Sequence, residues 1–471
     1  MREAVPFIQQ RSSVGYIPLL TALTFLIQSS DTSLLYLSLP TIAQALHVPL
    51  RAMDGLVLSY LAAVVLATPC SPWLMARYGE RKVYLLALCV FMLAALGCSR
   101  AASLPALCLW RLAQGSGGAL MVAAARVLLL KTVAEDQQAR QLNRVTAIGL
   151  LGTLLGPVCG GISLALMPWR GLFLLPLPLC LLCLLSCRSV AIDGAPSEAP
   201  FDLGSYLLSA PALLLCLGVI TPVGRELLAP VGWLPITVMI GGLTAITLWR
   251  LAQRPQGGLF DSALLAHRDY RISLAGNVLV RICLSSTPLL LSMCIQTTPY
   301  GATTTAASLA LLCFAGGALS VRLFLNRALE RFGYRRLLTH GCLVGAALLA
   351  ALSTPGFDQT LMFVLGLSFG LGVTSSAIYC CLNTLAFSAL NDESYGAGNS
   401  LLTLVQLLSM MLGIAISFAF LAYHNVAQPQ HVSGGYGALF RLMACGLALS
   451  AALFSRLDKA QGIRRQATAR R

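Results

Sequence analysis

Long apolar runs are the feature of this sequence that most restricts its fold. Stretches of about 20 apolar residues recur along the whole chain, and a helix of that length crosses the hydrocarbon core of a bilayer. Only 10% of the residues are charged and 57% are hydrophobic, whereas about 25% of the residues of a soluble domain are charged. Because a helix satisfies its own backbone hydrogen bonds in hydrocarbon, the sequence predicts an all-α polytopic membrane protein.

The apolar runs predict 14 membrane spans, grouped as six, two and six. This grouping divides the chain into an N-terminal six-helix bundle (1–188), two inserted transmembrane helices (189–255), a C-terminal six-helix bundle (256–456) and a basic tail (457–471). The spans are expected at residues 16–37, 55–75, 83–98, 103–130, 145–165, 169–187, 203–222, 232–252, 271–293, 302–325, 337–354, 360–387, 398–423 and 436–455.

Basic residues set the expected orientation of these spans. Lys and Arg cluster in alternate loops and in the C-terminal tail, and loops rich in them stay in the cytoplasm. We therefore expect a bacterial inner-membrane protein with both termini in the cytoplasm. The net charge of +15 follows from these clusters and requires no nucleic-acid partner, and the tail is expected to contact lipid headgroups. The clusters include Arg77, Arg81 and Lys82; Arg250, Arg254, Arg268 and Arg271; and Arg464, Arg465, Arg470 and Arg471.

One loop pattern occurs twice, after the second and after the tenth predicted span. Each copy has a glycine two residues before a basic pair, with Gly79 before Arg81 and Gly333 before Arg335. A glycine at this place permits a tight turn with positive φ. The repetition predicts two related six-span bundles, an arrangement that many transporters share.

Further motifs follow within the spans. The first span reads Gln28-Ser-Ser-Asp31-Thr, and the fourth reads Arg111-Leu-Ala-Gln114-Gly-Ser-Gly117-Gly118. The fifth carries glycines at steps of three and four, which form one smooth helix face suited to close packing. With the two loops, these motifs resemble the Major Facilitator Superfamily and, within it, the 14-span drug:proton antiporter branch. The residues of the fifth span are Gly149, Gly152, Gly156, Pro157, Gly160 and Gly161.

The resemblance implies a fold, an activity and roles for several residues. It implies two six-helix bundles with two inserted helices, forming a proton-coupled exporter of a small molecule. Such a protein functions as a monomer and uses the proton gradient rather than a cofactor as its energy source. The fifth span resembles the antiporter signature of exporters. The residues expected in the gating loops are Gly79, Arg81, Glu330, Gly333 and Arg335.

The two loops also depart from the family motif, Gly-x-Leu-x-Asp-Arg-x-Gly-Arg-Arg. In the first loop Pro72 replaces the initial Gly and Ala76 replaces the Asp; in the second, Asn326 replaces the Gly. In the family, that Asp is linked to stabilising the inward-closed state. Because the first loop lacks it, the motif does not predict how the gate of this protein closes. Stretches around Gly333, Asn383 and Gly398 resemble a bacterial subtype that is named for multidrug export and linked to export of iron citrate.

Asp31 is the acidic residue that we place deep inside a predicted span. A carboxylate in hydrocarbon is costly, so it is expected to face a wet cavity or a partner, and Arg111 is the natural partner. A carboxyl that moves between two such environments can bind and release a proton. The alternative is a structural acid that accepts hydrogen bonds from hydroxyls such as Thr32 or Ser33. The alternative role for Arg111 is that of a structural residue that contacts backbone carbonyls.

Three arginines inside spans, without matching acids, predict the charge of the substrate. They are Arg126, Arg281 and Arg322. Unpaired cations in a low-dielectric cavity favour an anionic ligand, and arginine binds carboxylates bidentately. We expect an anion such as citrate, iron citrate or a carboxylate siderophore. The alternative is that these arginines are structural, with Arg126 and Arg322 extending to the membrane interface; a broad-specificity multidrug exporter then fits better.

Other polar side chains are candidates to line the substrate cavity, although each fits an interhelical contact as well. No motif for nucleotide binding or hydrolysis occurs, and the 16 cysteines lack zinc-type spacing. We therefore expect no catalytic residues, no enzyme activity and no metal site. A membrane sensor is the alternative from another class of protein. The candidate cavity residues are Gln28, Tyr60, Gln296, Tyr379, Asn383 and Gln406.

Overall fold

The computed structural model describes residues 16–188, 268–297, 303–353, 361–388, 395–427 and 432–456. Every regular element in these ranges is a helix, so the predicted all-α fold is confirmed. Contacts divide the chain into two compact units that meet in sequence between Asp202 and Leu203. Residues 16–188 therefore belong to the first unit, and the described residues from 268 onward belong to the second.

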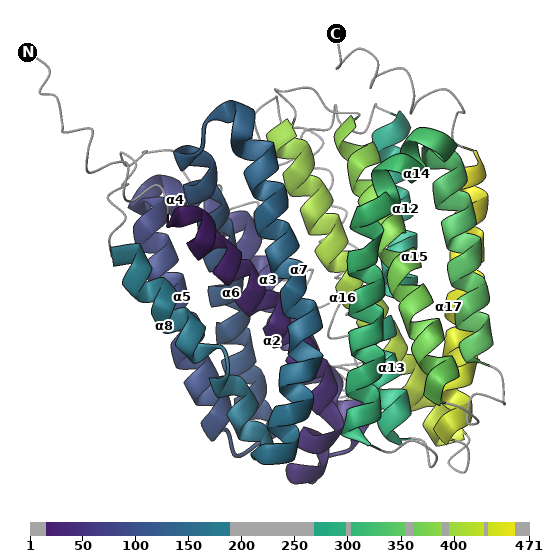
Figure 1. Cartoon of the computed structure of the whole chain (residues 1–471). Helices are drawn as coiled ribbons and strands as arrows, with labels where there is room; N and C mark the ends of the chain where they lie inside the picture. The colour runs from purple at the N-terminus through teal and green to yellow at the C-terminus, as the bar shows by residue number, and fades with distance from the viewer. Residues whose placement is uncertain are drawn as a thin grey trace, which may run out of the picture. The chain divides into compact units, whose positions relative to one another are not determined.

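The first unit is a bundle in which α2 and α6 are central (Figure 1). α2 packs against α6, α7 and α8, while α6 packs against α3 and α5 as well. Short 3-10 turns connect some of these helices: η1 (Leu50–Met53), η2 (Thr68–Cys70) and η3 (Trp169–Leu174). The helices are α2 (Ile17–Ala45), α3 (Asp54–Ala67), α4 (Ser71–Tyr78), α5 (Glu80–Arg100), α6 (Leu104–Thr132), α7 (Glu135–Leu166) and α8 (Leu177–Arg188).

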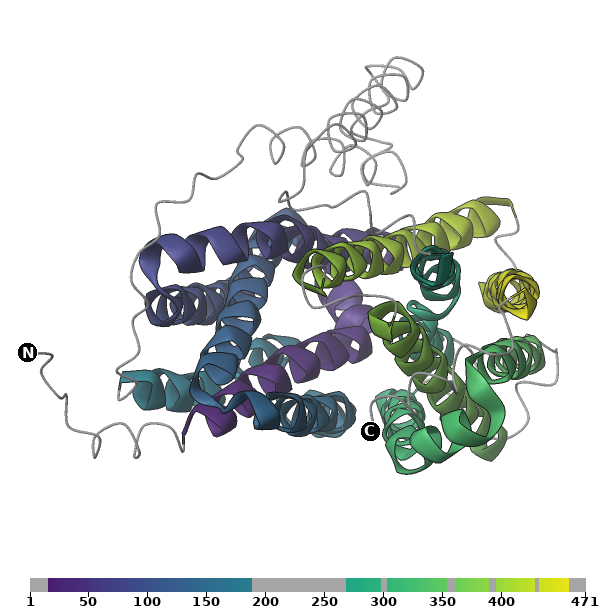
Figure 2. The same ribbon diagram turned by 90° about the horizontal axis from the view of Figure 1, so that it is seen from above.

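The second unit is a bundle of the same kind, seen end-on in Figure 2. α12 contacts α15, α16 and α17, and the long α14 contacts α13, α15 and α17. The turn between α12 and α13 falls at Ser285 and Ser286, and Pro288 follows it. The helices are α12 (Arg268–Leu284), α13 (Thr287–Thr297), α14 (Thr304–Leu352), α15 (Leu361–Ser388), α16 (Tyr395–Ala427) and α17 (Val432–Ser455).

Eleven helical segments in the described residues are long and apolar enough to cross a membrane. They coincide with the second to sixth predicted spans and with the last six, although 302–325 and 337–354 join into α14 around Gly333. The first predicted span forms α2, which does not meet the same criterion because residues 28–33 are all polar. The predicted spans 203–222 and 232–252 lie outside the described residues.

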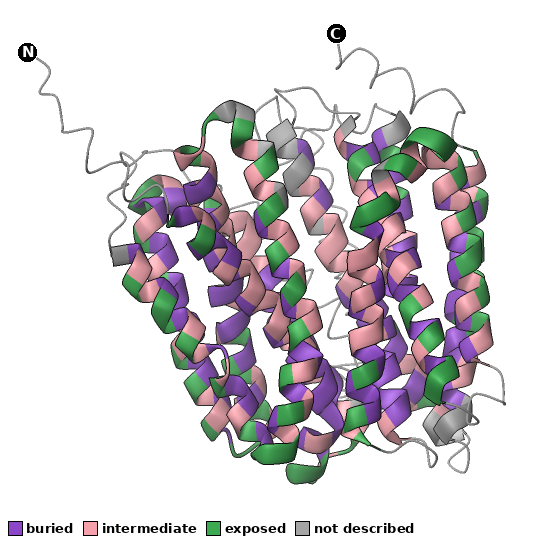
Figure 3. Cartoon of the chain, in the orientation of Figure 1, coloured by how far each residue is buried: buried purple, intermediate pink, exposed green. Residues whose placement is uncertain are grey.

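Exposed residues recur along the helices (Figure 3), and many of them are large and apolar. Leu86 of α5, Leu323 of α14 and Leu449 of α17 are each more than 60% exposed. A soluble protein rarely exposes so much apolar surface, whereas lipid is the natural neighbour of such faces. The protein is therefore a multi-pass membrane protein.

The two repeated loops share one backbone conformation. Gly79 has φ 85° and ψ 147°, and Gly333 has φ 71° and ψ 165°. Both values lie in a region that is nearly restricted to glycine. The positive φ predicted for both loop glycines is therefore confirmed. Gly79 separates α4 from α5, and Gly333 interrupts α14.

Gly333→Ala is expected to lower the free energy of unfolding by about 1–3 kcal/mol, because alanine is strained in this backbone conformation. A Cβ at position 333 would meet no atom within 4 Å, so the cost is conformational rather than steric. Thermal unfolding of the purified protein gives the change in melting temperature. Gly366→Ala is the matched control, since position 366 is equally open but lies within α15. Equal melting temperatures for the two variants would contradict the prediction.

Candidate functional site

A buried ion pair joins α2 to α6 in the first unit. Nη1 of Arg111 donates a hydrogen bond to Oδ2 of Asp31 at 2.8 Å. Arg111 lies seven residues into α6, and Asp31 lies at the middle of α2. Because α2 and α6 pack against each other, the two side chains meet although they are 80 residues apart in the sequence.

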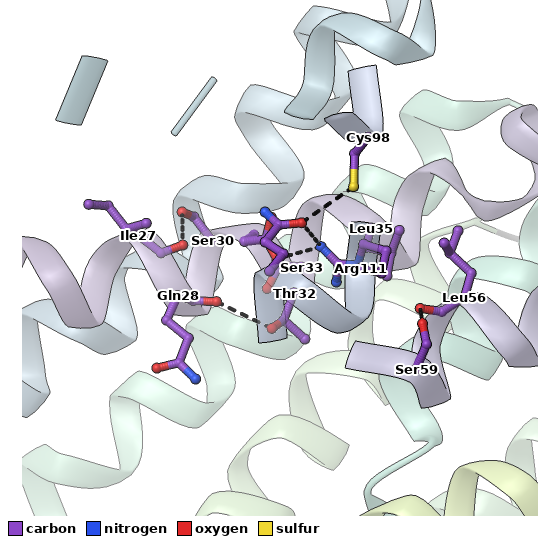
Figure 4. A network of polar contacts seen from close by, with 12 residues as sticks. Ile27, Gln28, Ser30, Thr32, Ser33, Leu35, Leu56, Ser59, Cys98 and Arg111 are labelled. Carbon is purple, nitrogen blue, oxygen red and sulfur yellow. Dashed lines mark hydrogen bonds and ion pairs between the residues drawn. The ribbon is translucent and has the colours of Figure 1, made fainter. Parts of the chain in front are cut away.

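Gln114 completes this pair as a third member. Figure 4 shows the polar contacts around Arg111 from close by, with Cys98 nearby. Nε2 of Gln114 donates to Oδ1 of Asp31 at 3.0 Å, and Oε1 of Gln114 accepts from Nη1 of Arg111 at 2.9 Å. The thiol of Cys98 on α5 also donates to this Oε1 at 3.8 Å. One amide therefore contacts both charged partners, because residues three apart on a helix share a face.

The triad of Asp31, Arg111 and Gln114 is almost completely shielded from solvent. The exposed fractions are 4%, 1% and 0%. The Cζ atom of Arg111 lies 4.4 Å from the ring centroid of Tyr60 and 6.0 Å from that of Phe173. In such surroundings the attraction between the charges is strong, and the loss of either partner leaves a costly buried charge.

The hydroxyls beside Asp31 in the sequence take no part in this triad. Thr32 donates to the backbone oxygen of Gln28 at 3.2 Å, and Ser33 donates to that of Ser29 at 3.1 Å. The alternative in which Thr32 or Ser33 donates a hydrogen bond to Asp31 is therefore wrong, because each hydroxyl donates to a backbone carbonyl of its own helix. The hydrogen bonds that Arg111 makes here go to side chains rather than to backbone carbonyls.

The glycine-rich face of α7 packs directly against α2. A Cβ at Gly152 would lie 2.5 Å from the oxygen of Leu26, and one at Gly156 would lie 2.6 Å from Cβ of Ser33. A Cβ at Gly160 would lie 3.0 Å from Leu34. α7 continues through Pro157 to Leu166. These glycines allow the close approach of α7 to the helix that carries Asp31.

Arg281 is the charged centre of a second polar group, in the second unit. The side chain is half-buried in α12, and its Nε donates to Oδ1 of Asn277 at 3.2 Å. Its Cζ atom lies 4.5 Å from the ring centroid of Tyr379 on α15. On α15, Asn383 is one turn beyond Tyr379, and its Oδ1 accepts from Nε2 of Gln406 on α16 at 2.7 Å. Asn277 and Tyr379 thus lie against Arg281, and the Asn383–Gln406 hydrogen bond joins α15 to α16 one turn further along α15.

The other predicted cavity residues lie in different surroundings. Arg126 of α6 is half-buried with its Cζ 5.6 Å from the ring of Phe25. Arg322 of α14 is exposed. Gln28 is half-buried on α2, three residues before Asp31, and Gln296 bonds Ser292 of its own helix. Arg126 belongs to the first unit, whereas Arg281 and Arg322 belong to the second, where Arg281 is half-buried and Arg322 is exposed.

The first repeated loop is tied to two neighbouring helices. Glu80, buried at the start of α5, forms an ion pair with Lys131 in the last turn of α6. Nε of Arg81 donates to the backbone oxygen of Cys187 on α8 at 3.3 Å. The pairing of Glu80 with Lys131 is not predictable from the sequence, because no local spacing links residues 51 positions apart. In the second loop, Glu330 and Arg335 lie on either side of Gly333 in α14, exposed and half-buried respectively.

Two bundles of apolar helices, with charged side chains inside them, define a polytopic membrane transporter. Residues 21–414 match the family model described as the Major Facilitator Superfamily. The chain belongs to this superfamily, whose members are transporters of small molecules and not enzymes.

Curated relatives narrow the class. The chain is 28% identical over 459 residues to the "Putative multidrug resistance protein MdtD" of Pectobacterium atrosepticum, covering 95% of this chain and 97% of the relative. It is 30% identical over 452 residues to the protein of the same name from Escherichia coli O6:H1, covering 93% of each chain. The multidrug-export subtype that the sequence resembles is this MdtD type.

Solved structures support the fold. A D-xylose-proton symporter aligns with a TM-score of 0.69 at 14% identity, covering 95% of this chain and 99% of the other. A POT family transporter in complex with 5-aminolevulinic acid aligns with a TM-score of 0.68 at 12% identity, covering 93% and 94%. At these identities the likeness concerns the fold alone.

Proposed function

We propose that this protein is a proton-coupled exporter of a small carboxylate-type anion, such as citrate, iron citrate or a carboxylate siderophore. Transport would proceed by alternating access, with protons moving inward as the anion moves outward. Both termini would lie in the cytoplasm, the segment 189–255 would supply two further spans, and the protein would act as a monomer. The two repeated loops would gate the cytoplasmic side.

The observation that carries the proposal is the setting of Arg281. The described parts of the second unit contain two acidic residues, Asp269 in the first turn of α12 and Glu330 beside the Gly333 turn. Asp269 is 12 residues from Arg281, which is about 18 Å along a helix. Among the described residues no ion pair involves Arg281. A half-buried guanidinium of this kind favours an anionic ligand, because a carboxylate both neutralises it and accepts two of its hydrogen bonds.

Proton coupling is assigned to the first unit. Asp31 carries the acidic group of the buried triad, and its two oxygens accept from Arg111 and Gln114. When a conformational change draws Arg111 away, the carboxylate loses its counter-charge and takes up a proton. When the pair forms again, the proton is released. The geometry thus supports a carboxyl whose protonation alternates with its contact to Arg111.

A broad-specificity multidrug exporter is the second candidate. The names of the MdtD relatives favour it. The exposed position of Arg322 also fits it, because an exposed arginine reaches the membrane interface without binding substrate. In this case Arg281 would be structural, held by Asn277 and Tyr379.

Transport into inverted membrane vesicles with an imposed pH gradient separates the two candidates. Labelled citrate, with and without iron, is compared with a lipophilic dye in the same vesicles. Gradient-dependent accumulation of citrate or iron citrate, absent from vesicles without the protein, supports the anion exporter. Accumulation of the dye with no movement of either citrate form would reject it in favour of multidrug export.

A further inference from the structure

The ring of Tyr60 is the nearest aromatic partner of the buried arginine in the first unit. Tyr60 lies on α3 and is 4% exposed, and its ring centroid is 4.4 Å from Cζ of Arg111. A guanidinium at this distance is attracted to the negative face of the ring. The Nε atom of Arg111 is buried and makes no hydrogen bond to any residue that the structure describes. The ring therefore supplements the hydrogen bonds that Arg111 makes to Asp31 and Gln114.

Two glycines of α6 allow Tyr60 to reach this position. A Cβ at Gly115 would lie 2.3 Å from the backbone oxygen of Tyr60, and one at Gly118 would lie 2.9 Å from its hydroxyl oxygen. Both distances are too short for any side chain. The sequence shows these glycines only as part of a motif, and the structure explains them as the surface against which Tyr60 packs.

The contribution of the ring depends on the charge of Asp31. While Asp31 is ionised, its carboxylate neutralises Arg111, and the ring adds little. Once Asp31 is protonated, the guanidinium is a buried cation without a counter-ion, and such a charge is costly. Cation–π attraction is strongest under these conditions, because the cation is desolvated and not otherwise neutralised. The ring therefore stabilises the protonated state of the triad more than the ionised state.

Several other titratable groups surround this pair and act on both states. They are Tyr36 on α2, Tyr60 on α3, Cys98 on α5, Cys108 on α6 and Cys180 on α8. Tyrosine and cysteine side chains are ordinarily uncharged near neutral pH. The aromatic face of Tyr60 is thus the neighbouring group whose contribution changes most when Asp31 gains a proton.

We propose that Tyr60 is a positioning residue for proton uptake: its ring, not its hydroxyl, holds the Arg111 guanidinium while Asp31 carries a proton. This inference rests on the proposed role of Asp31 as the proton-binding group. Weakening the ring's negative face destabilises the protonated state. Asp31 then takes up its proton only at more acidic pH.

Fluorination of the ring tests this without changing its shape. Y60F is the reference, and further variants carry monofluoro-, difluoro- or trifluorophenylalanine at position 60, which progressively reduce the negative charge of the ring face. Infrared difference spectra of the purified protein are titrated with pH. The carbonyl band of the protonated carboxyl is assigned to Asp31 by its absence in D31N. The midpoint is expected to fall by about 0.5–1 pH unit from Y60F to the trifluoro variant, in step with fluorination.

The matched control is the same substitution series at Phe91, a buried residue of α5 whose backbone packs against Gly117 and whose ring lies beside Gly118; it should leave the midpoint of the Asp31 band in place. A midpoint that is the same across the Tyr60 series overturns the inference about Tyr60, and so does a shift between wild type and Y60F as large as the whole fluorination effect. The absence of any Asp31 band that titrates would instead overturn proton binding by Asp31, and with it the proposed coupling. The two failures are therefore distinguishable.

Discussion

Asp31→Asn should reduce transport driven by a pH gradient to the level of vesicles without the protein. Asparagine keeps a carbonyl that can accept from Arg111, but it cannot bind a proton. The loss of a counter-charge should also destabilise the protein, by up to about 3–5 kcal/mol, because Arg111 is left as an uncompensated buried cation. Two effects, on coupling and on stability, are thus expected from one substitution, and they must be separated.

The double variant Asp31→Asn/Arg111→Gln separates them. It removes both charges, so much of the lost stability should return, as for other neutralised buried pairs. Gradient-driven transport should remain absent in the double variant, since no group is left to bind the proton. Thermal unfolding and vesicle transport are measured on the same preparations. Gradient-driven transport by either variant at the wild-type rate would show that Asp31 is not the coupling residue.

Arg281→Ala should weaken binding of a carboxylate substrate by about 10- to 100-fold, the effect of losing one charge-assisted interaction. Arg281→Lys keeps the charge but loses the planar fork that bonds two carboxylate oxygens, so its affinity should be intermediate. The loss arises from the substrate contact and not from a broken ion pair, because no ion pair involves Arg281 among the described residues. Stability should therefore change much less than in Asp31→Asn.

Binding of labelled citrate to the purified protein measures this effect, with the iron complex tested in parallel. Arg441→Gln provides the matched control: Arg441 is also an arginine inside an apolar helix of the second unit, but it is exposed on α17. Equal affinities for citrate in wild type and Arg281→Ala would show that Arg281 does not bind the substrate. An equal loss of affinity in Arg441→Gln would show that the effect arises from the overall charge of the protein and not from Arg281.

The sequence predicted those features that depend on local composition. The apolar runs located α2 and the eleven apolar helical segments, and the position of a glycine before a basic pair predicted the backbone of Gly79 and Gly333. Asp31 and Arg111 were recognised because a charge in an apolar run is rare and costly. Arg111 was predicted as the natural partner of Asp31, and the two side chains form an ion pair.

Features that depend on packing between distant segments could not be predicted. Gln114 belongs to a motif, but its bonds to both charges depend on the depth at which α2 and α6 cross. The ion pair of Glu80 with Lys131 depends on how α5 starts beside the end of α6. Arg126, Arg281 and Arg322 look alike in the sequence, yet one is exposed and two lie against aromatic rings of different helices. Periodicity carries no information on such contacts.

Proton movement driven by substrate, in liposomes that contain the purified protein, tests the central claim most directly. An outward gradient of citrate or iron citrate is imposed with no pH gradient present, and internal pH is followed with a trapped dye. An antiporter should draw protons inward as the anion leaves, so the interior acidifies; Asp31→Asn liposomes and liposomes without protein should show no change. Acidification that persists in Asp31→Asn, or loss of the anion from wild-type liposomes without proton movement, would contradict proton coupling through Asp31.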